Sequence, residues 1–187
     1  MRLKMQMKAT INRLDGGAFR MIVALLILAL LAPGLACAQT AQSAEEARLL
    51  EFGKEIFKSK AVCQFCHKWD ASGDQGYGGN ALSLRATQLS PEQLTEVVKC
   101  GRPGTGMPYH DRFAYTDKRC YGLTEAELGA SVPALPPGAT LQKREAAAIA
   151  DYLLAKVIGR GAVTREECEE VFSERGARSC GQYPGKQ

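Results

Sequence analysis

The stretch "CQFCH", residues 63–67, carries the side chains of this chain that are best suited to chemistry. Two thiols are separated by two residues, and an imidazole follows the second thiol directly. Two thiols at this spacing can cycle as a redox disulfide, thiolates with an imidazole can bind zinc, and two thiols followed by histidine can attach a haem. The surroundings of the motif must decide among these three chemistries.

Those surroundings favour haem attachment. A thioredoxin-like disulfide needs a βαβ context, and no segment of the sequence alternates convincingly as a strand. Zinc needs further ligands, such as a second C-x-x-C, and the sequence has none. Haem attachment uses all three residues, because Cys63 and Cys66 add to the vinyl groups as thioethers and His67 binds the iron. A structural disulfide beside an incidental histidine is the remaining alternative.

A second iron ligand is expected in "GTGMP", where Met107 follows His67 by 40 residues. A thioether is a soft ligand that raises the reduction potential of the iron. The other four methionines all lie within the first 38 residues, so a single methionine is left for the rest of the chain. His110 is the alternative sixth ligand and would lower the potential. We favour Met107 and expect His110 at the surface or near the haem propionates.

Residues 1–38 have the pattern of a secretory signal peptide. A basic leader precedes "MIVALLILALLA", and "ACA" then offers a small-residue cleavage site, so the mature chain is predicted to begin at Gln39 in the periplasm. An uncleaved membrane anchor is the alternative, but the apolar run is shorter than the roughly 18 residues of a spanning helix. Lipidation at Cys37 is a minor alternative.

Charge and cysteine content narrow the class of protein. Of 24 basic and 20 acidic residues, the leader holds 5 and 1, so 19 of each remain and the mature chain is formally neutral. This balance does not support nucleic-acid binding. Six cysteines remain, an even number that favours pairing in an oxidising compartment. Cys100 and Cys120 bracket the Met107 loop and are expected to pair, as are Cys168 with Cys180, although other pairings stay open.

Four helices must position these groups. Capping residues and apolar periodicity predict them over residues 43–57, 90–101, 142–159 and 164–176. Ser43 with Glu46 forms the first expected capping box. The loops between the helices are long and rich in turn residues, which in a compact domain points to a large cofactor that organises them.

The order "GKEIF", "CQFCH", "SLR", "LSPEQLTEVVKCG", "GMP" and "AIADYL" resembles a class I c-type cytochrome over residues 43–158. The resemblance implies an all-α fold wrapped around one covalently attached haem c. It also implies that the first and last helices cross at Gly53 and Tyr152, and that the carbonyl of Leu82 holds the ring of His67.

Three departures from that family pattern accompany the resemblance. Leu82 stands where proline is common, and the gap from Phe57 to Cys63 is longer than expected. Lys68–Trp69 replaces the usual glycine after the histidine. These departures bear on local geometry and leave the haem-attachment residues in place.

Two arginines and the tail complete the predicted site. Arg85 and Arg112 are candidates to pair with haem propionates, because a guanidinium fork matches a carboxylate, and a solvated surface role is the alternative for each.

The chain is predicted to divide into a signal peptide (1–38), a cytochrome domain (39–158) and a disulfide-stapled extension (159–187). The extension is either packing or a partner-docking surface, and packing is favoured.

The predicted function is electron transport by a periplasmic monohaem cytochrome. Because both axial positions of the iron are filled, we expect a carrier without catalytic residues, working between a dehydrogenase donor and a terminal oxidase or another cytochrome. One alternative is the cytochrome subunit of a dehydrogenase complex, for example one oxidising alcohols with a quinone cofactor. A haem-based sensor or enzyme would need an open sixth position. Membrane association is expected only if the leader is retained.

Overall fold

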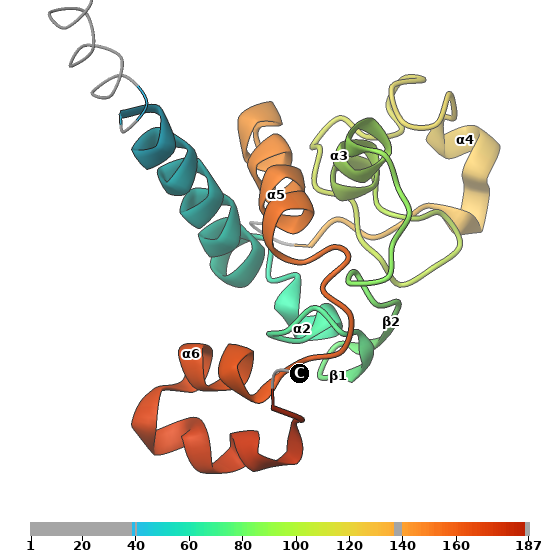
Figure 1. The fold of residues 1–187 in the computed structure, drawn as a ribbon. Coiled ribbons are helices and arrows are strands. Elements are labelled where there is room, and N and C mark those ends of the chain that lie inside the picture. Colours follow the sequence, from blue (N-terminus) through green and yellow to red (C-terminus); the bar gives the residue numbers. More distant parts are fainter. Residues whose placement is uncertain (1–38, 40, 137–139, 186–187) are drawn as a thin grey trace, which may run out of the picture. The chain divides into compact units, whose positions relative to one another are not determined.

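The computed structural model describes residue 39 and residues 41–136 and 140–185 (Figure 1). The chain divides into two compact units, Met1–Ala47 and Arg48–Gln187. The predicted signal peptide, residues 1–38, lies outside the described residues. Within the described ranges, no helix combines the length and the apolar character that crossing a membrane requires.

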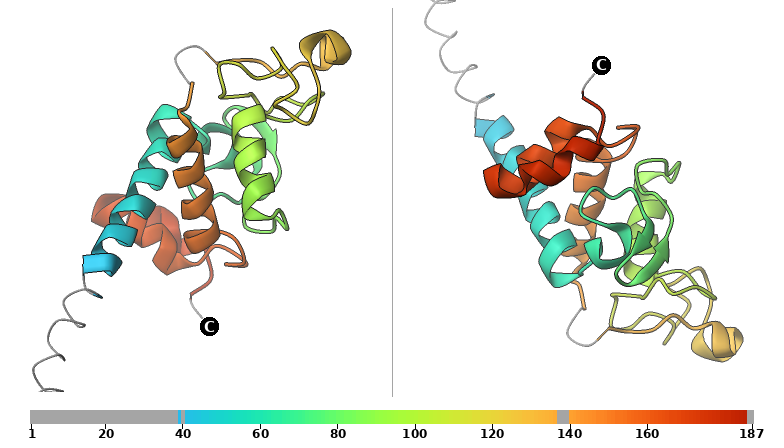
Figure 2. Two further views of the ribbon diagram at one scale, coloured as in Figure 1. Left: turned by 90° about the horizontal axis from the view of Figure 1, so that it is seen from above. Right: turned by 90° about the horizontal axis from the view of Figure 1, so that it is seen from below.

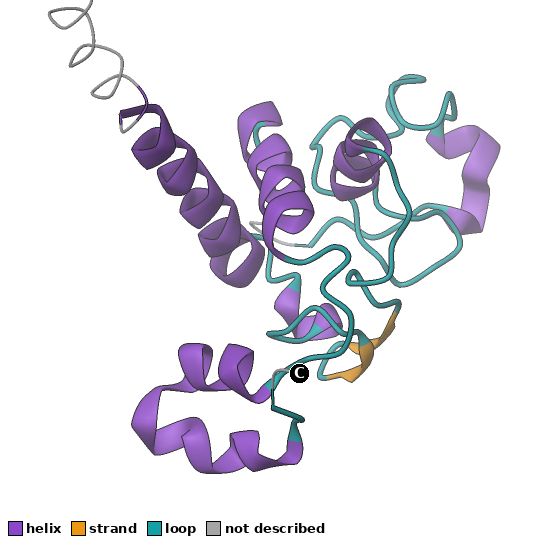
Figure 3. Ribbon diagram, in the orientation of Figure 1, coloured by secondary structure: helices purple, strands orange, loops and turns teal. Residues whose placement is uncertain are grey.

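The second unit is built mainly from helices joined by long loops (Figure 3), in agreement with the predicted all-α class. Residues 48–55 are helical. The elements that follow are η1 (Ile56–Lys60), α2 (Gln64–His67), α3 (Pro91–Cys100), α4 (Glu125–Leu128), η2 (Gly129–Ser131), α5 (Lys143–Lys156), α6 (Arg165–Gly176) and η3 (Ala177–Gln182).

Among the described residues, the helices are interrupted by a β-hairpin, so the expectation of no strands was wrong. Strand β1 (Asp74–Gly76) pairs antiparallel with β2 (Gly79–Ala81), and Gly76 lies opposite Gly79. These short strands are polar and glycine-rich, so they lack the apolar alternation by which strands are found in a sequence. Their two-residue connection and their packing on α2 hold the hairpin instead.

Capping residues place the helix starts largely as predicted. At α3 the amide of Gln93 donates to Oγ of Ser90 (3.3 Å) and the amide of Ser90 donates to Oε1 of Gln93 (2.9 Å). The same reciprocal pair forms at α6 between Thr164 and Glu167. The predicted start at Ser43 was wrong, because the chain is already helical at residue 41.

The core of the second unit lies between three helical segments. Figure 2 shows α5 between the helical residues 48–55 and α3. A Cβ atom added to Gly53 would lie 2.0 Å from the carbonyl oxygen of Ala148 and 3.0 Å from Cβ of Tyr152. The predicted crossing at Gly53 and Tyr152 is therefore confirmed, since only a glycine lets the two backbones approach so closely.

The long gap between Phe57 and Cys63 has a structural explanation. Residues Ile56–Lys60 form a π-helical turn, in which the amide of Ala61 donates to the carbonyl of Ile56 at 2.9 Å. A π turn holds one residue more than an α turn, so it takes up extra chain without moving the flanking segments. Phe57 remains 2% exposed in the core.

Both expected disulfides are present. Cys100 is bonded to Cys120, and Cys168 is bonded to Cys180, each with a Cα–Cα distance of 5.6 Å. The first pair joins the end of α3 to the far side of the Met107 loop. The second joins α6 to η3, so that the C-terminal extension doubles back on itself.

Candidate haem site

The attachment motif forms a single helical turn that a glycine-rich hairpin covers. Cys63 is the N-cap of α2, and its carbonyl accepts hydrogen bonds from the amides of Cys66 (3.2 Å) and His67 (2.9 Å). A Cβ atom at Gly78 would lie 2.4 Å from Sγ of Cys66, and one at Gly76 would lie 2.4 Å from the Cys66 carbonyl oxygen. Only glycines allow the hairpin this close to α2.

The thiols of Cys63 and Cys66 are free, whereas the other described cysteines are bonded in pairs. Burial raises the pKa of the Cys63 thiol to about 12, and the nearby Cys66 adds to the rise. A thiol that keeps its proton is a poor redox nucleophile, because that role needs the thiolate. A thioether carries no charge, so the same burial does not oppose it.

A metal site built from protein ligands alone finds no support. Across the part of the chain that the structure describes, no three His, Cys, Asp or Glu side chains converge in a way that could hold a metal ion.

His67 is oriented by the segment that follows the hairpin. Its Nδ1 lies 3.0 Å from the carbonyl oxygen of Leu82, as the family resemblance implied. A carbonyl only accepts hydrogen bonds, so Nδ1 carries the proton and Nε2 keeps a lone pair for a metal. Burial lowers the pKa of His67, the bond to Leu82 opposes this, and the charge of Arg102 lowers it further. The ring is therefore held as a neutral ligand.

Met107 lies in the loop after α3. Its carbonyl accepts from the amide of Arg102 (3.2 Å), and its own amide donates to Oγ1 of Thr105 (3.2 Å). Ligation of iron by Met107 stays a prediction.

His110, the alternative ligand, is 4% exposed, so the expected surface position was wrong, while the alternative position near the haem propionates stays a prediction. Its amide donates to the carbonyl of Lys99 (2.8 Å), and its carbonyl accepts from the amide of Leu141 (2.8 Å). The backbone at His110 thus links the end of α3 to the segment that leads into α5.

Arg85 is buried and has protein partners at every guanidinium nitrogen. Its Nη2 lies 2.9 Å from Oε2 of Glu167 and its Nε donates to the carbonyl of Gly161 (2.7 Å). Its Nη1 donates to the carbonyl of Asp70 (3.2 Å). Arg85 therefore joins the segment that orients His67 to the C-terminal extension. Its predicted propionate contact is untested.

Arg112 is exposed, and its guanidinium lies over the ring of Phe113, 5.1 Å from the centroid. Arg119 lies over the same ring at 5.3 Å. The propionate role predicted for Arg112 likewise stays a prediction.

Trp69 is the residue near the site whose role the sequence reading missed. Its ring meets Phe172 of α6 edge-on at 5.1 Å and Tyr183 at 6.1 Å. In the sequence, Lys68–Trp69 is a departure from the cytochrome pattern. The signal for the contact is the combination of that departure with two aromatic residues in the tail. The extension thus packs against a residue two positions after His67.

Part of the chain that contains these residues matches a known protein family. Residues 49–125 match the family model described as "Cytochrome C oxidase, cbb3-type, subunit III". The match supports a c-type cytochrome. No curated protein and no solved structure matches the chain. The matched residues include Cys63, Cys66, His67 and Met107, and they end before α5. A domain of this type implies covalently bound haem c, electron transfer and redox proteins as partners.

Proposed function

We propose that this chain is a periplasmic monohaem cytochrome that carries electrons between redox proteins. One observation carries the proposal: two unpaired thiols and an oriented, neutral histidine share a single turn of helix, at Cys63, Cys66 and His67. Attachment of haem c needs these three groups in this order.

The residues present fit the group. Cys63 and Cys66 would hold it as thioethers, Nε2 of His67 would bind the iron, and Sδ of Met107 would be the second protein ligand. When bound, haem c supplies an iron that exchanges one electron. The carbonyl of Leu82 fixes the ring plane of His67, as hydrogen bonds to metal-bound histidines generally do. The amide of Arg102 donates to the carbonyl of Met107 and so ties the start of the loop to the proposed second ligand.

A protein thioether in the sixth position separates a carrier from an enzyme. If Met107 binds the iron, its thioether would leave no iron position for a substrate or a gas, and this soft ligand would raise the reduction potential. The sensor or enzyme alternative requires that Met107 be displaced or absent from the iron.

Aromatic side chains next to the motif offer a contact for redox partners. Phe65 is 51% exposed and Tyr77 95% exposed, and their rings stack with centroids 6.3 Å apart. Phe65 comes from α2 and Tyr77 from the tip of the hairpin. A dehydrogenase donor and an oxidase or cytochrome acceptor would meet this pair beside Cys66.

A second candidate is a cytochrome subunit within a larger complex. The matched family model describes a subunit of an oxidase, and a dehydrogenase complex would use the same electron-transfer chemistry. Haem staining of native complexes separates the two: a carrier migrates as a free small protein, whereas a subunit migrates with its complex.

Replacement of Met107 by alanine tests the ligand set. The ferric wild-type protein should show the weak near-infrared band of sulphur bound to iron, and Met107→Ala should lose the band and bind added imidazole. Phe113→Ala in the same loop is a control that should keep the band. A spectrum unchanged in Met107→Ala would point to His110 as the ligand and would contradict the proposed pair.

A further inference from the structure

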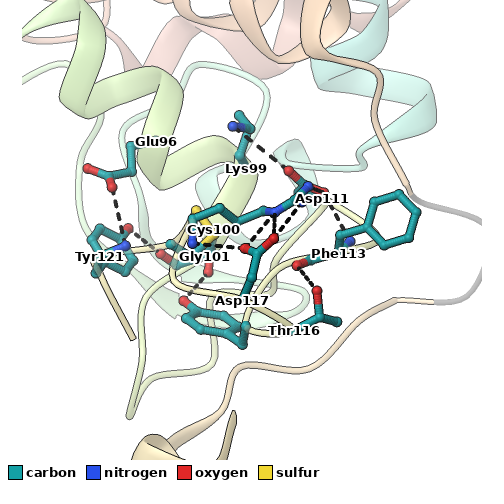
Figure 4. The surroundings of a disulfide bond; sticks show 12 residues. Glu96, Lys99, Cys100, Gly101, Asp111, Phe113, Thr116, Asp117 and Tyr121 are labelled. Carbon is teal, nitrogen blue, oxygen red and sulfur yellow. Dashed lines mark hydrogen bonds and ion pairs between the residues drawn. A yellow bond between two sulfur atoms is a disulfide. The ribbon is translucent and has the colours of Figure 1, made fainter. Parts of the chain in front are cut away.

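Two tyrosine hydroxyls lie at the end of α3, directly before the Met107 loop. Tyr115 donates to the carbonyl of Cys100 at 2.6 Å, and Tyr121 donates to the carbonyl of Gly101 at 2.7 Å. Figure 4 shows Tyr121 beside Cys100 and Gly101. The last carbonyls of a helix have no donors within the helix. The two hydroxyls therefore satisfy consecutive carbonyls where α3 ends.

The loop returns onto the same point. Gly101 has φ +64°, and a Cβ atom there would lie 2.6 Å from the carbonyl oxygen of Pro108 and 2.7 Å from that of Met107. The amide of Arg102 also donates to the Met107 carbonyl. The position of Met107 thus depends on how firmly the Gly101 peptide is held.

The two tyrosines are themselves held in unusual conformations. Tyr115 is 2% exposed, and the φ angles of Tyr115 and Tyr121 are 61° and 54°, a region that bulky residues rarely occupy. A positive φ angle at a bulky residue is retained where the surrounding structure constrains the backbone, often at functional sites. The disulfide from Cys100 to Cys120, the neighbour of Tyr121, supplies part of that constraint. Burial raises the pKa of Tyr115, and it raises the pKa of Tyr121 to about 12. Both hydroxyls are therefore protonated donors at neutral pH.

We propose that Tyr115 and Tyr121 are positioning residues that hold the Met107 loop closed and so keep Met107 in place as the sixth ligand. This inference rests on the proposed function. An external ligand reaches the iron only in the open-loop population, so loss of a hydroxyl bond raises that population and with it the apparent affinity for the external ligand.

The test measures imidazole binding to the ferric holoprotein. Tyr115→Phe and Tyr121→Phe should each bind imidazole about fivefold more tightly than wild type, the change expected from one net hydrogen bond. Both should also weaken the near-infrared sulphur band. Tyr109→Phe is the matched control: Tyr109 packs edge-on against Tyr115 at 5.8 Å, and its hydroxyl is not part of either bond to α3. This variant should keep the wild-type affinity.

Wild-type imidazole affinity in both variants, or an equal gain in Tyr109→Phe, would overturn the inference. If Tyr115→Phe does not fold, Tyr121→Phe decides, since that ring is 36% exposed. Hydrogen exchange at amides 102–107 is a second readout and should be faster in the two variants than in the control. If Met107→Ala leaves imidazole affinity unchanged, the ligand assignment fails, and the exchange comparison alone decides whether the tyrosines hold the loop.

Discussion

At the scale of single residues, the site depends on glycines that allow close packing of backbones and on one carbonyl that orients the His67 ring. Glycines allow the hairpin to pack closely on Cys66, and Gly53 allows its helix to pack closely on α5. The carbonyl of Leu82 binds Nδ1 of His67 and so leaves Nε2 available to a metal. The roles of Cys63, Cys66 and His67 could be predicted from the sequence, because haem attachment requires these residue types at this spacing. The buried position of His110 was not readable, since it depends on where the chain after α3 returns.

Gly53→Ala tests the close helix crossing. The added Cβ would lie 2.0 Å from the carbonyl oxygen of Ala148, so the helices must separate, and we expect a loss of about 1–3 kcal/mol in the free energy of unfolding, typical of overpacking. Denaturant unfolding measures it. Gly181→Ala is the control, because no atom lies within 4 Å of its added Cβ. Equal stabilities of the two variants would contradict the close crossing.

At the scale of elements, the sequence predicted the helix starts that are marked by local hydrogen bonds between capping residues. The capping pairs Ser90–Gln93 and Thr164–Glu167 mark helix starts by short-range hydrogen bonds, and both were found. The hairpin was missed because its strands are held by turn glycines and by packing on α2, and neither leaves an alternating apolar pattern. In the sequence, the π turn appears only as a long gap between Phe57 and Cys63. The anchoring of the extension was missed because Trp69 and Phe172 are about a hundred residues apart in sequence.

Trp69→Ala tests how the extension is anchored. Removing the ring deletes its contacts with Phe172 and Tyr183, and we expect a loss of about 2 kcal/mol for a partly buried aromatic residue. Hydrogen exchange in α6 should become faster, while α3 is unaffected. Trp69→Phe should restore most of the protection. Unchanged exchange in α6 with Trp69→Ala would show that the Arg85–Glu167 ion pair suffices alone.

At the scale of the whole molecule, charge bears on how partners meet. With residues 1–38 removed, the chain holds equal numbers of acidic and basic residues, so no strong long-range steering is expected. Contact would then depend on short-range packing at the aromatic pair of Phe65 and Tyr77.

The rate of electron exchange with the physiological partner should therefore depend only weakly on salt. Stopped-flow reduction at low and at physiological ionic strength measures this, and Tyr77→Ala should slow the reaction at both, because its stacked ring is lost. Thr116→Ala, on an exposed loop position, is the control. A rate that falls steeply as salt increases would show that clustered charge guides the encounter instead.

The covalent attachment of one haem is the central claim, and intact mass under denaturing conditions tests it most directly. Protein produced with a functioning haem-attachment system should gain the mass of one haem, and the gain should survive acid–acetone extraction. The paired variant Cys63→Ser with Cys66→Ser should lose the gain, because both thioether bonds are absent. Haem that extracts from the wild-type protein, or a mass equal to that of the bare chain, would contradict the account.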